Sequence, residues 1–188
     1  SRFVPDLEAT NLLEYFLISA VVSLLAIRFF LNLTGFPQLG GEGFHIAHML
    51  WGGILMLVSI IFFASFLNAQ SKVIAAVFGG IGFGTFIDEL GKFITSDNNY
   101  FYQPTIGIIY VFFVLLFLLI RWLASISEYS PETYVVNAIE GLKEVVMNDL
   151  DTNEKHKTLA YLKKIKQPTP AIKQLEELIK QTKPIRVE

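Results

Sequence analysis

Residues 43–71 read GFHIAHMLWGGILMLVSIIFFASFLNAQS and contain no Asp, Glu, Lys or Arg. A second uncharged stretch covers residues 98–120 and ends in the apolar run at 111–120. An α-helix needs about 20 mostly apolar residues to cross the roughly 30 Å hydrocarbon layer of a bilayer. Each of the two stretches is longer than that, so each predicts a membrane-spanning helix.

Two further apolar segments flank the first stretch and carry a few charges. The segment before it contains Glu14 and Arg28, and the segment after it contains Asp88, Glu89 and Lys92. Four such segments within 128 residues are typical of a membrane bundle. The sequence therefore predicts an all-α polytopic membrane protein with four transmembrane helices, near residues 11–34, 44–67, 72–95 and 104–126.

Composition divides the chain in two. Of its 188 residues 53% are hydrophobic and only 17% charged, and residues 129–188 hold 19 of the 32 charged side chains. All 17 Phe and both Trp fall within residues 1–128. We therefore expect a membrane domain at 1–128, followed by a small soluble helical domain at 129–188.

The C-terminal region carries the start signals of three short helices. Ser130 and Thr169 each precede a proline, which is a favourable N-cap and first-residue pair, and Asp151 with Glu154 matches a capping box. The region is also rich in lysine. A cluster of these lysines would contact anionic lipid or simply form a solvated face: Lys155, Lys157, Lys163, Lys164 and Lys166.

The distribution of Lys and Arg predicts the orientation. In a four-span arrangement Arg2, Lys72, Arg121 and the lysine-rich tail lie on one side of the membrane. The connections near 35–43 and 96–103, on the other side, contain no Lys or Arg. Because positive residues are enriched on the cytoplasmic side, both termini are expected in the cytoplasm.

Several kinds of chemistry are excluded or disfavoured. The chain has no cysteine, which excludes disulfides, thiolate catalysis and an iron–sulfur cluster. A net charge of −2 gives no indication of nucleic-acid binding. We expect no haem, because His45 and His48 lie on one face of one helix and cannot bind opposite faces of a haem.

The ionisable residues of the spans gather at one depth. With alternating helix directions, six of them fall in roughly the outer third of the bilayer: Arg28, His45, His48, Asp88, Glu89 and Lys92. Asp97 and Tyr100 lie in the outer connection at the same end. Ionisable groups within a membrane are costly, so this cluster is the candidate functional site.

Helical spacing favours convergence of these residues. His45 and His48 share a face with Gly52, and Asp88 and Lys92 continue an i,i+4 stripe from Gly80 and Gly84. A Gly-x-x-x-Gly pair allows two helices to approach closely, so this stripe is expected to face protein, with Asp88 and Lys92 paired. Glu89, rotated by about 100°, would face the histidines or a neighbouring subunit.

Two imidazoles with a carboxylate form a plausible site for a divalent metal ion. His45 and His48 with Asp88 or Glu89 would supply the ligands, and Asp97 a further ligand or a supporting hydrogen bond. Arg28 and Lys92 would balance charge or hold an anionic group. The hypothesis is an outward-facing polar site that binds a metal ion or a small polar ligand.

Three other functions stay open. A histidine base beside Arg28 or Lys92 would suit an enzyme that acts on lipid head groups, although no nucleophile motif specifies a reaction. Alternatively, the polar groups would only stabilise the bundle of a structural subunit. Such a subunit would form a homo-oligomer or recruit partners of a membrane complex through its glycine-rich helix faces or its tail. Ion or proton transport would require an oligomeric pathway, because the inner halves of two spans are nearly all apolar.

The blocks GGEGFHIAHMLWGG at 40–53 and GIGFGTFIDELGKFIT at 80–95, with DNNYF at 97–101, resemble an uncharacterised family of small bacterial integral membrane proteins. Its members share the patterns GGxxxHIAHxLWGG and GIGFGxFIDExGKF, and the resemblance covers about residues 28–122. It implies a location in the bacterial inner membrane, and it implies no particular activity.

Overall fold

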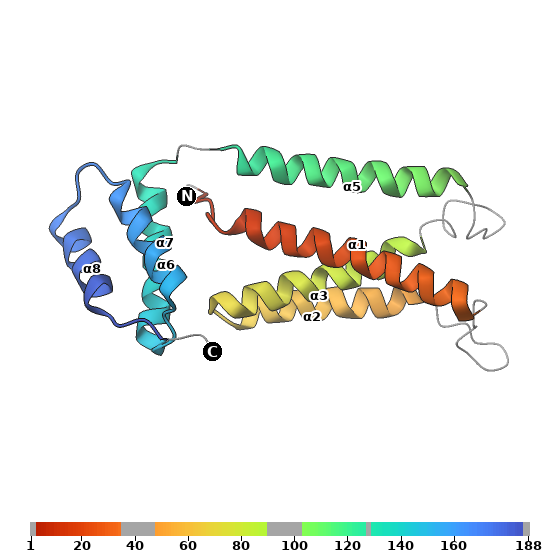
Figure 1. The fold of residues 1–188 in the computed structure, drawn as a ribbon, viewed down its shortest axis with the longest axis horizontal. Coiled ribbons are helices and arrows are strands. Elements are labelled where there is room, and N and C mark those ends of the chain that lie inside the picture. Colours follow the sequence, from red (N-terminus) through yellow and green to blue (C-terminus); the bar gives the residue numbers. More distant parts are fainter. Residues whose placement is uncertain (1–2, 35–47, 90–102, 127–128, 186–188) are drawn as a thin grey trace. The chain divides into compact units, whose positions relative to one another are not determined.

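The computed structural model describes residues 3–34, 48–89, 103–126 and 129–185. These residues form seven helices and no strand beyond an isolated bridge (Figure 1). The helices are α1 (Ala9–Thr34), α2 (His48–Ser65), α3 (Ala69–Asp88), α5 (Gln103–Ala124), α6 (Pro131–Met147), α7 (Thr152–Lys163) and α8 (Pro170–Gln181). The all-helical prediction is confirmed.

The chain forms two compact units. One unit, called the membrane unit below, comprises Thr10–Ser125 and contains nearly all of α1 together with α2, α3 and α5. The other, the tail unit, combines Ser1–Ala9 with Ile126–Glu188 and contains α6, α7 and α8. The inclusion of the N-terminal residues in the tail unit is not indicated by any sequence pattern.

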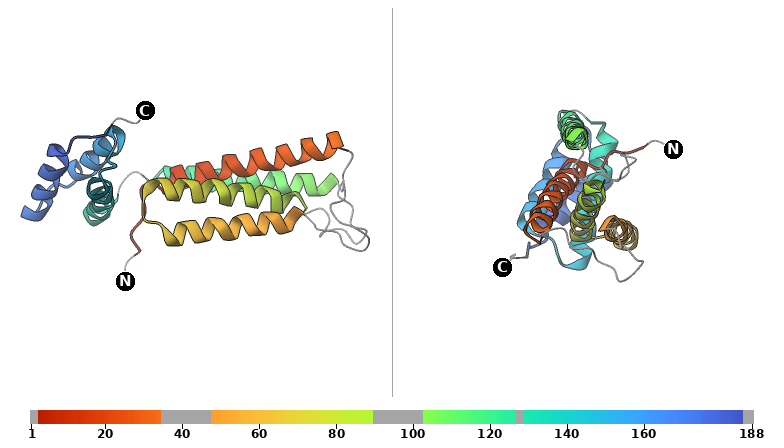
Figure 2. Two further views of the ribbon diagram at one scale, coloured as in Figure 1. Left: turned by 90° about the horizontal axis from the view of Figure 1, so that it is seen from below. Right: turned by 90° about the vertical axis from the view of Figure 1, so that its right-hand side faces the viewer.

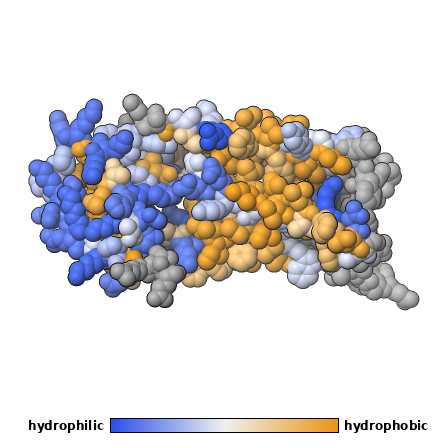
Figure 3. Space-filling model, in the orientation of Figure 1, coloured by the Kyte–Doolittle hydropathy of each residue, from blue (hydrophilic) through white to orange (hydrophobic). Residues whose placement is uncertain are grey.

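Three helices of the membrane unit are long and apolar enough to cross a bilayer, namely α1, α3 and Pro104–Ala124 of α5. The apolar part of α2, Met49–Ser65, is shorter than these. Figure 3 shows hydrophobic residues over much of the surface of this unit, whereas hydrophilic residues cover most of the tail unit. Large apolar side chains exposed along all four helices are typical of a surface that faces lipid.

Helix α3 is the central element of the membrane unit, because it contacts the other three helices. Phe83 of α3 lies 5.6 Å from Phe16 of α1 and 6.4 Å from Phe113 of α5, measured between ring centroids. Phe78, on another face of α3, lies 6.2 Å from Phe62 of α2. The end-on view in Figure 2 shows α3 between α1 and α2.

The glycines of α3 determine how closely these helices pack. A Cβ atom at Gly82 would lie 2.6 Å from the carbonyl oxygen of Gly52 on α2. On another face of α3, Cβ atoms at Gly80 and Gly84 would overlap the carbonyl oxygens of Phe16 and Ala20 on α1. The close approach that the Gly-x-x-x-Gly spacing predicts is confirmed, and it occurs between α3 and α1.

In the tail unit the three predicted helix starts are confirmed. Ser130 and Thr169 accept hydrogen bonds from the backbone three residues later, and Asp151 with Glu154 forms both bonds of a capping box. A small core holds the three helices together and consists of Ala138, Leu162, Ile165 and Ile179.

Residues 5–8, which precede α1, are attached to α6 and α7. The Asn137 amide donates to the carbonyl of Pro5 and accepts from the backbone N–H of Leu7, both at 2.9 Å. Glu8 accepts from Lys157 at 2.7 Å and from the Tyr161 hydroxyl at 2.8 Å. Burial, reinforced by this bond to Glu8, raises the pKa of Tyr161 well above its usual value, so the phenol stays protonated. We call residues 5–8 the N-terminal strap.

Candidate functional site

An ion pair joins α1 and α3 near the end of both helices. The Nε atom of Arg28 lies 2.6 Å from Oδ1 of Asp88, whose side chain is 4% exposed, whereas that of Arg28 is 33% exposed. Asp88 follows Gly84 by one helical turn, so the glycine contact that brings the backbones together also turns Asp88 towards α1.

A layer of hydroxyl groups lies about one turn further into the same interface. Ser23 of α1 is within 3.1 Å of both the Thr85 hydroxyl and the Ile81 carbonyl of α3. Thr85 also donates to the Ile81 carbonyl, at 2.8 Å. The α1–α3 interface is thus polar for more than one turn, and its inner layer is satisfied by hydrogen bonds within the protein.

Two more buried polar side chains lie at this end of the unit. Glu89, at the C-cap of α3, is fully buried, including both carboxylate oxygens. Thr105, in the first turn of α5, is 1% exposed, and its hydroxyl has no hydrogen-bond partner within the described residues. A threonine further along a helix can donate its hydroxyl to the backbone carbonyl four residues earlier. Thr105 lies in the first turn, so the residue four positions earlier precedes the helix and offers no intrahelical carbonyl.

Packing places Thr105 at the same end of the membrane unit as the ion pair. Ile109, one turn after Thr105 on α5, packs with Ile87 of α3 and Leu24 of α1. Thr105 therefore occupies the face of α5 that is directed towards α1 and α3. Sequence reasoning missed Thr105, because a single hydroxyl at the start of an apolar helix carries no spacing signal.

The predicted site residues divide into those that the structure describes and those that it does not. It brings Arg28 and Asp88 into contact and places Glu89 next to Asp88. His48 is the first residue of α2, one turn before Gly52, whose backbone meets α3 at Gly82. The side chain of His48 lies outside the described part of the chain, as do four complete residues: His45, Lys92, Asp97 and Tyr100.

The Arg28–Asp88 pair limits what the site can do. Arg28 reaches Asp88 through Nε, and its two terminal nitrogens form no hydrogen bond with any residue that the structure describes. A guanidinium group binds carboxylate or phosphate through two parallel bonds, so these two nitrogens have the chemistry to bind a second anion. One oxygen of Asp88 is engaged by a cation, which makes this carboxylate a weaker metal ligand.

Metal-ligating side chains do not cluster within the described residues. In that part of the chain no group of three or more His, Cys, Asp or Glu residues is placed to hold an ion. What the described residues do assemble is an arginine, two buried carboxylates and a buried hydroxyl at one end of the membrane unit. This set can bind a polar molecule through charge and hydrogen bonds.

The fold defines the class of the molecule: three apolar helices of spanning length indicate a membrane protein. No family model, no curated protein and no solved structure matches the chain.

Proposed function

We propose that the chain is a four-span protein of the bacterial inner membrane, with both termini cytoplasmic. At the end of the bundle where α1 and α3 finish, it binds a small polar ligand. The observation that carries this proposal is the Arg28–Asp88 pair between α1 and α3, at the end of the unit that also buries Glu89 and Thr105. Burying this many polar groups in a membrane helix interface is costly, and ligand binding would offset the cost.

The N-terminal strap supports an even number of spans. Residues 5–8 precede α1, whereas their partners Asn137, Lys157 and Tyr161 all follow α5. The start of α1 and the end of α5 must then lie on the same side of the membrane. With α1, α3 and α5 as three spans, α2 supplies the fourth, since its 18 residues extend about 27 Å at 1.5 Å per residue.

Single cysteines test this topology, because the native chain contains none. Asn153→Cys in α7 and Gln70→Cys near the start of α3 are expected to react with an impermeant maleimide only from the cytoplasmic side. Gly41→Cys is expected to react only from the opposite side. If labelling placed residues 70 and 153 on different sides, the four-span arrangement would be wrong.

Arg28 indicates how the ligand is bound. Its terminal nitrogens, which bond to no described residue, would bind an anionic group of the ligand, while the Thr105 hydroxyl would donate or accept a further hydrogen bond. The adjacent buried carboxylates favour a second candidate ligand, a divalent metal ion. Such an ion would be held by His45, His48, Asp88 and Glu89, with Lys92, Asp97 and Tyr100 around it.

Two measurements on protein purified without chelator distinguish these ligands. In the first, inorganic phosphate is expected to raise the melting temperature in detergent, and Thr105→Val and Arg28→Lys should reduce this rise. Thr105→Val removes only the hydroxyl, and Arg28→Lys keeps the charge but loses the planar fork. Glu14→Gln, an exposed carboxylate near the other end of α1, is the control and should respond like the native protein.

The second measurement is elemental analysis of the same preparations. A stoichiometric divalent metal that is lost in Glu89→Gln but kept in Glu14→Gln would establish the metal candidate in place of the anionic ligand. If the preparations contain no metal and phosphate gives equal shifts in all variants, both forms of the proposal are wrong.

A further inference from the structure

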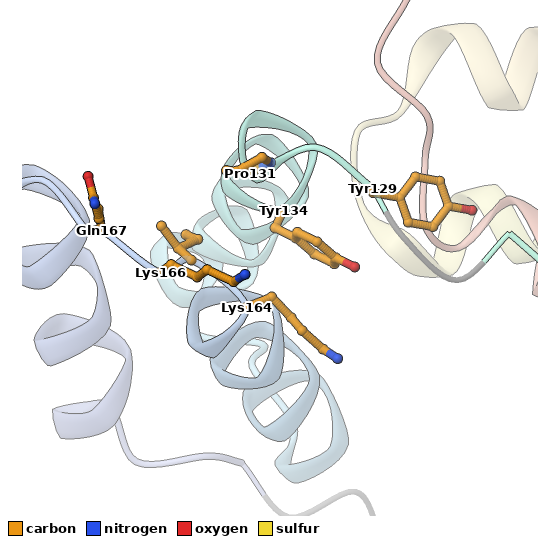
Figure 4. Close-up of a pocket in the computed structure, with 7 residues that line it drawn as sticks. Tyr129, Pro131, Tyr134, Lys164, Lys166 and Gln167 are labelled. Atoms are coloured by element: carbon orange, nitrogen blue, oxygen red, sulfur yellow. The ribbon is translucent and has the colours of Figure 1, made fainter.

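The tail unit contains a pocket that the proposed membrane site does not use. It has a volume of about 670 Å³ and is lined by Tyr129, Pro131, Tyr134, Lys164, Ile165, Lys166 and Gln167 (Figure 4). All of these residues belong to the tail unit. We call this cavity the lysine–tyrosine pocket.

The lining combines positive charge with aromatic surface. Lys164 and Lys166 supply two ammonium groups, and among the residues that the structure describes no carboxylate lines the pocket. The rings of Tyr134 and Tyr129 pack edge to face at a centroid distance of 6.2 Å, so two aromatic side chains border the pocket. Figure 4 shows the side chains of Tyr134 and Lys164 extending in the same direction from neighbouring helices. A ligand that fits this lining is anionic at one end and apolar at the other.

The lysines of the pocket differ from most others in the tail unit. Lys143, Lys157 and Lys180 are paired with glutamates, and Lys155 donates to two backbone carbonyls. Lys164 and Lys166 form no ion pair or hydrogen bond with any described residue. They follow directly on the last turn of α7, where their charge also interacts favourably with the helix dipole. Their ammonium groups are therefore available to an external anion.

The N-terminus of α6 lies at the same pocket. Pro131 is its first residue, and the positive end of a helix dipole favours phosphate or carboxylate nearby. Two ammonium groups that pair with no described residue, a helix N-terminus and two tyrosine rings thus border a cavity large enough for a small organic anion.

We propose that the lysine–tyrosine pocket binds a phosphate group that carries an apolar substituent, and that this is the head group of an anionic phospholipid. Tyr129 follows the last residue of α5 by five positions. Five extended residues reach at most about 18 Å, so chain length alone keeps Tyr129 within that distance of the end of a candidate membrane span. Basic segments next to a membrane helix are attracted to anionic lipid in general, and the pocket adds a defined site to this attraction.

Hydrogen–deuterium exchange of the full chain in lipid nanodiscs tests the proposal. We compare discs of phosphatidylcholine alone with discs that also contain phosphatidylglycerol, and we follow the amides of residues 129–134 and 161–167. The expected result is exchange at least threefold slower in the phosphatidylglycerol discs. In Lys164→Gln/Lys166→Gln this slowing should be lost.

The control is Lys173→Gln/Lys183→Gln, which removes the same charge from two lysines of the tail unit that do not line the pocket. This control should retain the slowing, because the effect depends on the pocket and not on net charge. A third arm adds millimolar inorganic phosphate to phosphatidylcholine discs. Slowing in that arm but not with phosphatidylglycerol would identify a soluble phosphate compound as the source of the group. The proposal is overturned if neither probe slows exchange, or if both lysine pairs affect it equally.

Discussion

Replacing Gly84 by alanine is expected to lower the free energy of unfolding of the membrane unit by about 3 kcal/mol, through overpacking that the helix backbones cannot relieve. A Cβ atom at this position would overlap the carbonyl oxygen of Ala20, and both groups belong to regular helices. The two helices must then separate. Separation would also weaken the hydroxyl layer at Ser23 and the ion pair at Arg28, both of which require the close approach.

The measurement is unfolding in increasing sodium dodecyl sulfate, followed by far-UV circular dichroism. Gly53→Ala is the matched control, because a Cβ atom at Gly53 meets nothing within 4 Å. Alanine is the better helix former by about 1 kcal/mol, so this control should be neutral or slightly stabilising. Equal losses in both variants would mean that the α1–α3 contact does not stabilise the unit.

Replacing Asp88 by leucine is expected to lower the free energy of unfolding of the membrane unit by about 3 kcal/mol, because it leaves the charge of Arg28 without its partner in an apolar setting. The value lies at the lower end of the range for broken buried pairs, since the Arg28 side chain is one third exposed and can partly reach solvent. The double variant Arg28→Leu/Asp88→Leu should recover most of this loss, because it removes both charges.

The same detergent titration measures the double-mutant cycle. Lys157→Ala provides the comparison, because it removes the much more exposed pair with Glu8 in the tail unit and should cost less than about 1 kcal/mol. If Asp88→Leu costs no more than Lys157→Ala, the Arg28–Asp88 pair is not a stabilising element. In the double variant a stable fold that no longer responds to phosphate would separate the structural role of the pair from its proposed binding role.

Much of the helix arrangement could be predicted from the sequence, because a bilayer imposes a length on apolar segments. The charge-free stretches at 43–71 and 98–120 predict α2 and α5, and the glycine spacing on α3 predicts its close contact. The boundaries are less accurate. Helix α3 begins at Ala69 and not near 72, since Asn68, three residues after the end of α2, provides an extended N-cap residue. Helix α2 ends at Ser65, two residues before the predicted end.

The polar contacts were harder to predict, because they depend on partners far apart in the sequence. Spacing predicted a pair between Asp88 and Lys92, and Lys92 lies outside the described residues. The pair that the structure shows joins Asp88 to Arg28 on another helix. Thr85 and Thr105 are single hydroxyls in apolar helices, so no periodic pattern distinguishes them from neutral positions. The depth of the ionisable residues was nevertheless sufficient to predict that the candidate site lies at this end of the helices.

The N-terminal strap has a consequence for the order in which the protein can be assembled during synthesis. Leu7 is made 130 residues before Asn137, the side chain that holds it. At typical synthesis rates of about 5–20 residues per second, roughly 7–26 s pass between the synthesis of Leu7 and that of Asn137. All four helices of the membrane unit are synthesised in that interval. The strap therefore binds to α6 late in biogenesis. It can do so only when the start of α1 and the end of α5 are in the same compartment.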